Sequence, residues 1–318
     1  MRRSLDARHR NRWTGRWLGV AVLALAWMIG ATLPARAQPS SGEEVQVAVN
    51  YVYAAQLGFG GYRVGGLDVN VYSLPIEYSL GEVLLDWRLK VALPVLYGDY
   101  DFKSSVQLEQ GRARLQLHQK TLSGEPKLKL EIPILEPWTL SLIGAWGFGY
   151  AFDTEGSGEL IDDPSRRAKV SETDFWYYTY QVGVSSLLQE TVDRWTLSLG
   201  NAFIYAGTAD LPSETDVQAY GAIETGVDAR HPLGFRIGDY APDASVLFIW
   251  YYFTPSLEFT RVGQKSLQVD NVYEVGLTFG ADPGTPFEIP VLGNPRLGIS
   301  YRVGNDLDAV RLNFGFPF

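Results

Sequence analysis

Few residues in this sequence can do chemistry by themselves. The chain has three histidines and no cysteine, and only His118 and His231 lie beyond the first 37 residues. A histidine paired with a carboxylate can act as a general base in hydrolysis, and Asp99 and Asp101 precede His118 in a polar stretch. A histidine–aspartate site is therefore conceivable, but a solvated histidine in a polar hairpin is the favoured interpretation.

Motifs for the common catalytic and cofactor sites are absent from the sequence. There is no G-x-S-x-G elbow, no H-E-x-x-H pair and no phosphate-binding P-loop. Without cysteine there is no disulfide, thiol nucleophile, iron–sulfur ligand or cysteine-built zinc site. We therefore expect no catalytic residue, no cofactor and no metal, and predict that the protein is not an enzyme.

A charged stretch at residues 153–174 suggests a different kind of chemistry. It mixes seven carboxylates with Arg166, Arg167 and Lys169. Clustered carboxylates attract divalent cations, and paired arginines suit phosphate groups such as those of lipopolysaccharide. No D-x-D-x-D-G spacing supports a dedicated calcium loop, so a hydrated loop is the favoured interpretation.

The remaining charged candidates lie in segments where polar and apolar residues alternate. They are Arg88, Lys90, Lys129, Glu131, Glu224, Glu258, Glu274, Arg296, Arg302 and Arg311. If the polar face of these segments lines a barrel, the charges either form an eyelet that selects small solutes or pair and fill the interior. Closure of such a barrel would bring Arg302 and Arg311 near Glu44.

The alternation itself is the main structural signal. Apolar residues recur at every second position in Val45–Tyr53, Leu85–Tyr97, Leu128–Ile134 and Trp138–Phe152, and again in later runs. The second and fourth of these segments are 13 and 15 residues long. Strands in globular proteins have about 5–6 residues, whereas tilted membrane strands need about 9–11. Aromatic residues near the strand ends are typical of the girdles of membrane barrels. The sequence predicts an all-β transmembrane antiparallel up-and-down β-barrel, with a soluble β-sandwich as the alternative.

Counting the alternating segments gives about 12 strands. The segment Val106–Thr121 would be a further crossing, and we interpret it as a hairpin extension above the membrane or as the upper part of the next down-strand. A change of phase near Pro75 predicts a β-bulge. The stretches Ala54–Gly66, Gly98–Ser105 and Asp153–Asp174 are expected as outer loops.

The N-terminal segment indicates export from the cytoplasm. Residues 1–37 contain a basic stretch, an apolar run from Trp17 to Leu33 and an A-x-A pattern before Gln38, which is typical of a cleaved secretory signal peptide. An uncleaved membrane anchor is the alternative. We predict a signal peptide at 1–37 and one barrel domain at 38–318. The net charge of −9 argues against a nucleic-acid partner.

The C-terminal segment carries a resemblance to a known class. The chain ends VRLNFGFPF, in which one apolar face is expected to hold Val310, Leu312, Phe314, Phe316 and Phe318. This ending resembles the terminal strand of Gram-negative outer-membrane barrels, which the barrel-assembly machinery reads as an assembly signal. Together with Leu297–Asp308, it resembles the solitary autotransporter-like β-barrel family. The resemblance implies a cell outer-membrane location, in contact with outer-membrane lipids and lipopolysaccharide.

One departure from true autotransporters shapes the expected function. Only Gln38–Glu44 separate the expected cleavage site from the expected first strand, so we expect no passenger domain and no lumen-plugging helix. We predict a monomeric outer-membrane β-barrel with a structural role or a narrow-pore role, passing solutes or ions passively. The alternative is an outer-membrane barrel enzyme that acts on lipid or peptide at the extracellular rim, with His118 as its candidate residue.

Overall fold

The computed structural model describes residues 59–64, 67–74, 76–84, 86–108, 111–161, 174–211, 218–238, 240–259, 267–281, 296–305 and 307–318. They belong to one compact unit, Ser41–Phe318. The predicted signal peptide, the expected first strand Val45–Tyr53 and Glu44 lie outside the described residues. Within those ranges no helix has the length and apolar character of a membrane span.

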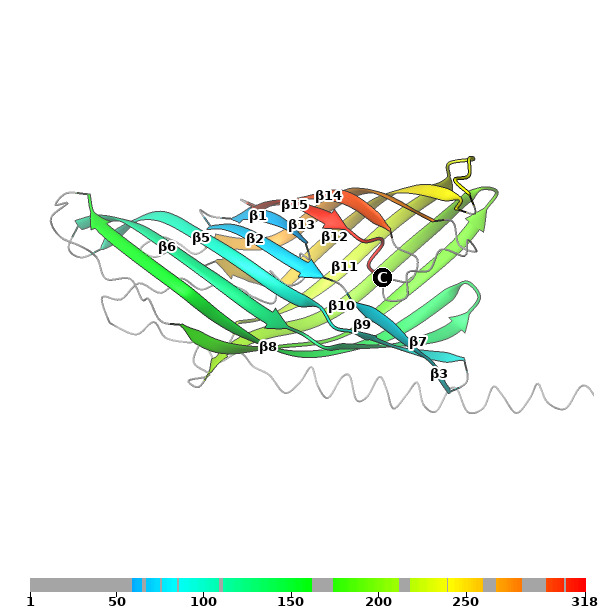
Figure 1. Cartoon of the computed structure of the whole chain (residues 1–318), viewed down its shortest axis with the longest axis horizontal. Coiled ribbons are helices and arrows are strands. Elements are labelled where there is room, and N and C mark those ends of the chain that lie inside the picture. The colour runs from blue at the N-terminus through cyan, green and yellow to red at the C-terminus, as the bar shows by residue number, and fades with distance from the viewer. Residues whose placement is uncertain are drawn as a thin grey trace, which may run out of the picture. The chain divides into compact units, whose positions relative to one another are not determined.

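Fifteen strands make up the described part of the chain (Figure 1). Their bounds are β1 Phe59–Val64, β2 Leu67–Leu74, β3 Glu77–Leu84, β4 Trp87–Ala92, β5 Val95–Leu108, β6 Gly111–Gly124, β7 Lys127–Leu135, β8 Trp138–Leu160, β9 Phe175–Val192, β10 Trp195–Leu211, β11 Gln218–Pro232, β12 Pro242–Phe259, β13 Leu267–Ala281, β14 Leu297–Gly304 and β15 Leu307–Asn313. All of the pairings between them are antiparallel.

The strands form one closed sheet. Around it the order is β3-β4-β7-β8-β6-β5-β2-β1-β15-β14-β13-β12-β11-β10-β9, and β8 also pairs with β9. The first and last described strands are neighbours, with Phe59 opposite Leu312 and Val64 opposite Leu307. Within the described residues the ring runs through β1, β15 to β8, β6, β5 and β2, while β3 pairs with β4 alone. A closed ring suits a bilayer, because lipid offers no hydrogen bonds to a free sheet edge.

Three pairs of strands are halves of single crossings, so the barrel has twelve strands, as predicted. The strand β8 pairs with β7 over its first part, Trp138–Ala145, and with β6 from Phe148 onward. The strands β6 and β7 are therefore two parts of one crossing. In the same way β2 and β3 form one crossing, and β4 and β5 form another. Backbone hydrogen bonds continue the ladder across the breaks: Leu93 N donates to Ile76 O at 2.8 Å, Glu125 N to Pro94 O at 3.3 Å, and Trp146 N to Pro126 O at 3.2 Å.

Proline accounts for two of these breaks. Pro94 lies between β4 and β5, and Pro126 lies between β6 and β7. Because proline has no backbone N–H, it cannot donate to the ladder and is tolerated where a strand is interrupted. The third break follows Leu74, close to the phase change that the sequence predicts near Pro75.

Several expected loops are strands in the structure. The segment Val106–Thr121 is the tip of a hairpin and the upper part of the next down-strand, so it adds no thirteenth crossing. The expected loop Gly98–Ser105 belongs to β5, residues 59–64 of the loop Ala54–Gly66 form β1, and β8 continues through Asp153 to Leu160. The outward side chains there are polar, and this polarity suggested loops from sequence alone.

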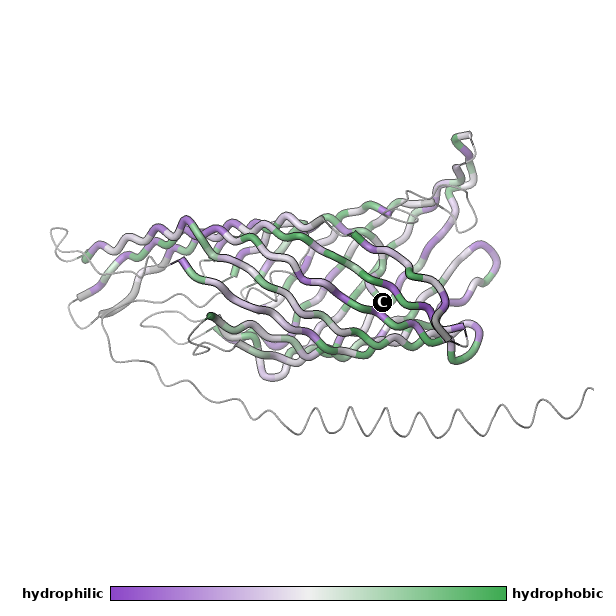
Figure 2. Tube along the Cα trace, turned by 60° about the horizontal axis from the view of Figure 1, so that its bottom comes forward, coloured by the Kyte–Doolittle hydropathy of each residue, from purple (hydrophilic) through white to green (hydrophobic). Residues whose placement is uncertain are grey.

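The polarity of the inward and outward side chains reverses along the length of the barrel. One end of the barrel carries the short turns β3–β4, β7–β8 and β9–β10, and the other end carries the long hairpin β5–β6. In the half with the short turns, exposed outward residues are apolar, among them Leu128, Trp146, Val227 and Val275. Buried inward residues in that half are largely polar, whereas in the half with the long hairpins they are apolar. Examples of this apolar inward set are Val64, Val69, Leu115, Leu257, Val269 and Leu307. Figure 2 shows hydrophobic and hydrophilic residues alternating along the crossings.

Closure between the first and last described strands can be tested by cross-linking in this cysteine-free chain. Arg63 lies directly opposite Asp308, whereas Val310 lies opposite Gly61. Directly opposed Cα atoms lie about 4.5–5.5 Å apart, within disulfide range, but diagonal neighbours are about 7–8 Å apart. We expect the Arg63→Cys/Asp308→Cys variant to oxidise to an intramolecular disulfide, seen as a reductant-sensitive gel shift. The Arg63→Cys/Val310→Cys variant should remain reduced, and the reverse pattern would contradict this register.

Candidate functional site

The interior holds a charge network whose central carboxylate, Glu274, is fully buried. Glu274 on β13 lies opposite Arg302 on β14, and the two residues are 0% and 4% exposed. The Arg302 Nε donates to Glu274 Oε2 at 2.7 Å, and Arg302 Nη2 donates to Tyr251 Oη at 2.8 Å. The Tyr251 hydroxyl and the Ser300 hydroxyl donate to the same carboxylate at 2.7 Å and 2.6 Å. Arg311 Nη1 lies 3.7 Å from Glu274 Oε2.

This network joins four neighbouring strands of the barrel. Tyr251 comes from β12, and its ring lies 4.5 Å below the Arg302 guanidinium carbon. Glu224, buried on β11, is opposite Tyr251 in the ladder and so belongs to the same layer. A buried charge is tolerated only when it is paired and hydrogen-bonded. The contacts to Glu274 meet this requirement and hold the centre of the barrel in one arrangement.

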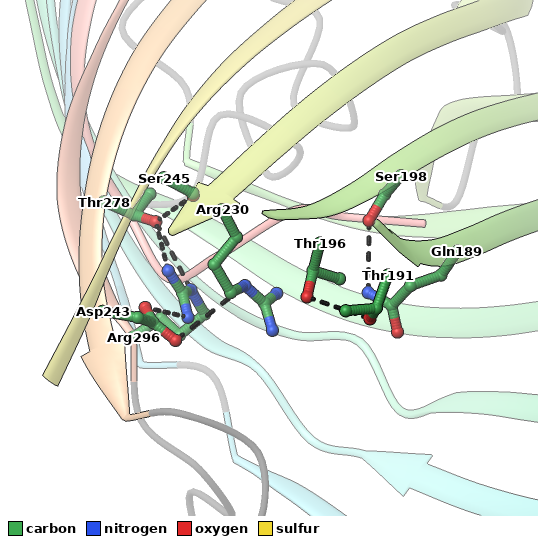
Figure 3. Close-up of polar contacts among 9 residues, drawn as sticks. All are labelled: Gln189, Thr191, Thr196, Ser198, Arg230, Asp243, Ser245, Thr278 and Arg296. Atoms are coloured by element: carbon green, nitrogen blue, oxygen red, sulfur yellow. Dashed lines mark hydrogen bonds and ion pairs between the residues drawn. The ribbon is translucent and has the colours of Figure 1, made fainter. Parts of the chain in front are cut away.

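A second polar cluster lies toward the short-turn end of β11, β12 and β13 (Figure 3). Arg296 Nη1 lies 2.6 Å from Asp243 Oδ1, and Arg230 Nε lies 4.0 Å from Asp243 Oδ2. The Arg296 Nε and Nη2 donate to Thr278 Oγ1 at 3.4 Å and 3.2 Å. The Thr278 hydroxyl is 2.8 Å from that of Ser245. Figure 3 also shows hydrogen bonds between neighbouring hydroxyl and amide side chains of β9 and β10.

The end of the C-terminal tail, residues 314–318, lies beside inward-facing glycines of β10 and β11. The strand β15 ends at Asn313, whose Oδ1 accepts a hydrogen bond from Gly315 N at 2.9 Å. Gly315 has φ +122°, a conformation that glycine adopts readily. Figure 1 places the C-terminus toward the end of the barrel with the short turns. Phe318 is buried against Gly200 on β10, and a Cβ on Gly226 of β11 would lie 2.9 Å from Phe318 and 3.1 Å from Phe316.

The tail corrects one expectation about the C-terminus. The five residues Val310, Leu312, Phe314, Phe316 and Phe318 do not share one face, because the strand ends before the last three of them. Val310 and Phe314 are exposed, whereas Phe318 is buried among inward-facing residues. Recognition of this segment by the barrel-assembly machinery stays a prediction.

The structure sorts the charged residues singled out in the sequence into three groups. Glu224, Glu274, Arg302 and Arg311 belong to the central layer, and Arg296 belongs to the cluster around Asp243. The backbone of Glu258 is part of β12, and its side chain lies outside the description. The carboxylate that engages Arg302 and Arg311 is Glu274, and the expected partner Glu44 lies outside the described residues.

The third group lies on β4 and β7 around Glu131. Lys90 Nζ lies 2.9 Å from Glu131 Oε1, Lys129 Nζ 3.6 Å from the same oxygen, and Arg88 Nε 3.7 Å from Oε2. Arg88 is largely exposed, whereas Glu131 is buried. These four residues therefore form an ion-pair cluster of their own, separate in the contacts from Glu274.

Sequence reasoning missed the residues that complete the two inner clusters. Tyr251, Arg230, Asp243 and Asp228, which is buried on β11 two residues before Arg230, are not among the candidates from the sequence. The spacing could have found them, because Asp228 follows Glu224 by four residues and Tyr251 follows Asp243 by eight on the same strand. Even spacing keeps side chains on one face of a strand. Their partners across the barrel, however, depend on the register.

Comparisons with known proteins support the architecture. No protein-family model matches the sequence, and no curated protein matches it. Among solved structures, the translocator domain of the autotransporter NalP from Neisseria meningitidis is similar, with TM-score 0.52 and 12% identity over 81% of this chain and 85% of that one. The β domain of the Bordetella autotransporter BrkA gives TM-score 0.49 and 11% identity over 81% of this chain and 96% of that one.

A third solved structure, the transport unit of the autotransporter AIDA-I from Escherichia coli, gives TM-score 0.44 and 11% identity, covering 81% of this chain and 88% of that one. Identities this low show the fold alone, and the NalP domain carries that conclusion. The chain has the closed twelve-strand antiparallel barrel of autotransporter β domains.

The central network can be tested by removing its carboxylate. We expect Glu274→Gln to lower the free energy of unfolding by about 3–5 kcal/mol, because it removes the carboxylate that pairs with Arg302 and Arg311 in the interior. The exposed pair Arg63–Asp68 is the matched control, and Asp68→Asn should cost less than about 1 kcal/mol. Urea unfolding in detergent micelles, followed by tryptophan fluorescence, measures both. Equal decreases in the free energy of unfolding of the two variants would show that Glu274 contributes no more to stability than an exposed ion pair.

The buried position of the tail can be tested at Gly200, because a side chain introduced there would collide with the Phe318 ring. A Phe316→Cys reporter introduces a single thiol into the chain. We expect Gly200→Leu to displace the tail and to raise the rate of maleimide labelling at least about tenfold. Gly144→Leu is the control, since nothing lies within 4 Å of a Cβ there. Equal labelling rates in both backgrounds would contradict a buried tail.

Proposed function

We propose that the chain is an outer-membrane β-barrel with a structural role, whose interior is closed rather than open to solutes. The observation that carries this proposal is the buried network of Glu274, Arg302, Tyr251 and Arg311. A water-filled eyelet would leave such side chains accessible to solvent, whereas Glu274 is 0% exposed. The charges of the central layer therefore satisfy one another, which favours the filled interior over the selective pore.

Two further layers support a closed interior. The apolar tail residues Phe316 and Phe318 lie beside Gly200 and Gly226 on the short-turn side of the network. On its other side, inward residues such as Leu115, Leu257 and Leu307 are fully buried. Barrels of about eight strands are filled by side chains and barrels of sixteen are open, so twelve strands permit either state and the side chains decide.

The outer-membrane location rests on the fold and on the surface. The fold is that of autotransporter β domains. The outer surface of the short-turn half is apolar, with Trp138 and Trp195 exposed beside the short turns and Trp176 exposed near the other end of β9. Apolar bands edged by aromatic residues are expected of strands in contact with lipid. A monomeric state and contact with lipopolysaccharide remain predictions from the sequence.

Single-channel recording of the mature chain, Gln38–Phe318, in planar bilayers tests the closed interior. We expect no discrete conductance steps from protein whose insertion is verified by heat-modifiable gel mobility. The variant Glu274→Ala/Arg302→Ala/Arg311→Ala removes both signs of charge together, so it leaves no orphaned partner within this triad. We expect this variant to show intermittent steps. Steps of equal size from the unmodified barrel would support the narrow-pore function instead.

A further inference from the structure

Three potential metal ligands meet on the outward face of β5 and β6. Asp99 and Asp101 are two residues apart on β5, and His118 on β6 lies directly opposite Asp101. Their neighbours Tyr100 and Phe102 are buried on the inward face. Residues two apart point to the same side of a strand, so Asp99, Asp101 and His118 form one outward group on two hydrogen-bonded strands.

The distances within this group match those between the ligands of one zinc ion. His118 Nδ1 lies 3.2 Å from Asp101 Oδ1 and 3.6 Å from Asp99 Oδ1. One donor atom from each residue lies within 4.8 Å of the other two. Zinc binds nitrogen and oxygen at about 2.0–2.2 Å in tetrahedral geometry, which separates two ligands by about 3.3 Å. The two separations from His118 Nδ1 therefore fit a common ion, and the two carboxylate oxygens lie within 4.8 Å of each other.

The charge around the group also favours a cation. Among the described residues, the ion pairs of Asp99 and Asp101 involve His118 alone, with no lysine or arginine. The neighbouring Lys120 instead engages Asp153 on β8. The Asp99 Oδ1 is shielded from solvent and accepts no hydrogen bond within the described part of the chain. Lys120 lies directly opposite Asp99 and offsets part of the negative charge, but its ammonium pairs with Asp153, so the two carboxylates can still attract a cation.

We propose that Asp99, Asp101 and His118 bind a zinc ion, which bridges β5 and β6 on the outer face of the long hairpin. Calcium prefers six to eight oxygen ligands and magnesium an octahedral oxygen shell, whereas one imidazole and two carboxylates suit zinc. Three protein ligands leave a fourth position for water. The sequence alone predicts no metal, because it carries no metal-binding motif, and the pairing of β5 with β6 is what shows that these three side chains share one face.

Isothermal titration of zinc chloride into the untagged mature barrel, refolded in detergent, tests this site. His118 and His231 are the two histidines of that chain, so His231→Asn is a matched control. The His231 ring lies 4.6 Å from the Trp195 ring, on strands away from β5 and β6. We expect one zinc per chain. His118→Asn and Asp99→Asn/Asp101→Asn should each weaken binding at least about tenfold, and His231→Asn should leave it unchanged.

Heat-modifiable gel mobility verifies that each variant is folded before titration. Absence of zinc binding by the folded wild-type barrel would overturn the proposal. So would equal affinity in the wild type and His118→Asn, since the three ligands would then have no role. A calcium chloride titration under the same conditions distinguishes a zinc site from general attraction of cations, and equally tight calcium binding would also count against it. None of these outcomes depends on whether the interior is closed.

Discussion

Every other feature of this molecule depends on closure of the hydrogen-bond ladder between β1 and β15. In a bilayer the strand N–H and C=O groups have no water to bind, so a sheet with free edges would leave a row of them unsatisfied. Six register pairs from Phe59–Leu312 to Val64–Leu307 close the sheet. Once the sheet is closed, each strand has one inward and one outward face. Successive residues point to opposite faces, so the position of a residue along its strand decides whether its side chain lies inside or outside the barrel.

Parity explains why buried charges and exposed apolar residues coexist in one chain. Along β13, Glu274 is fully buried while the adjacent Tyr273 and Val275 are exposed. In a soluble domain this arrangement would cost both burial of charge and exposure of apolar surface. A lipid environment removes the second cost, and the ion pair and hydrogen bonds to Glu274 offset the first. The same alternation makes the interior polar in the half of the barrel whose outer surface is apolar.

Much of the fold could be predicted from this alternation, because the period of two is a local property of the sequence. The twelve crossings follow from it, but the limits of the strands do not. Beyond the apolar band the outward face becomes polar, as at Asp99 and His118, while inward residues such as Tyr100 and Leu117 are apolar. A polar outward face looks like a loop when read alone, and only the pairing of β5, β6 and β8 shows that these segments are strands. The partners of Arg302 and Arg311 also depend on the register of the strands. The tail after Asn313 turns inward because Gly200 on β10 and Gly226 on β11 leave space for its aromatic rings, and neither strand is near the tail in sequence.

The reversal of side-chain polarity along the barrel also separates charged residues that are paired in the interior from charged residues that lie on the outer surface. Charges that point inward, such as Glu274 and Arg302, are fixed by partners on neighbouring strands and have little freedom to bind anything else. Charges that point outward beyond the apolar band are in contact with water and are held at fixed spacing by the ladder. A rigid strand pair that presents Asp99, Asp101 and His118 on one face needs no loop rearrangement to bring ligands together. Chemistry on this barrel is therefore favoured on the outer face of the extended hairpin, where ligands are both preorganised and accessible, rather than in the interior.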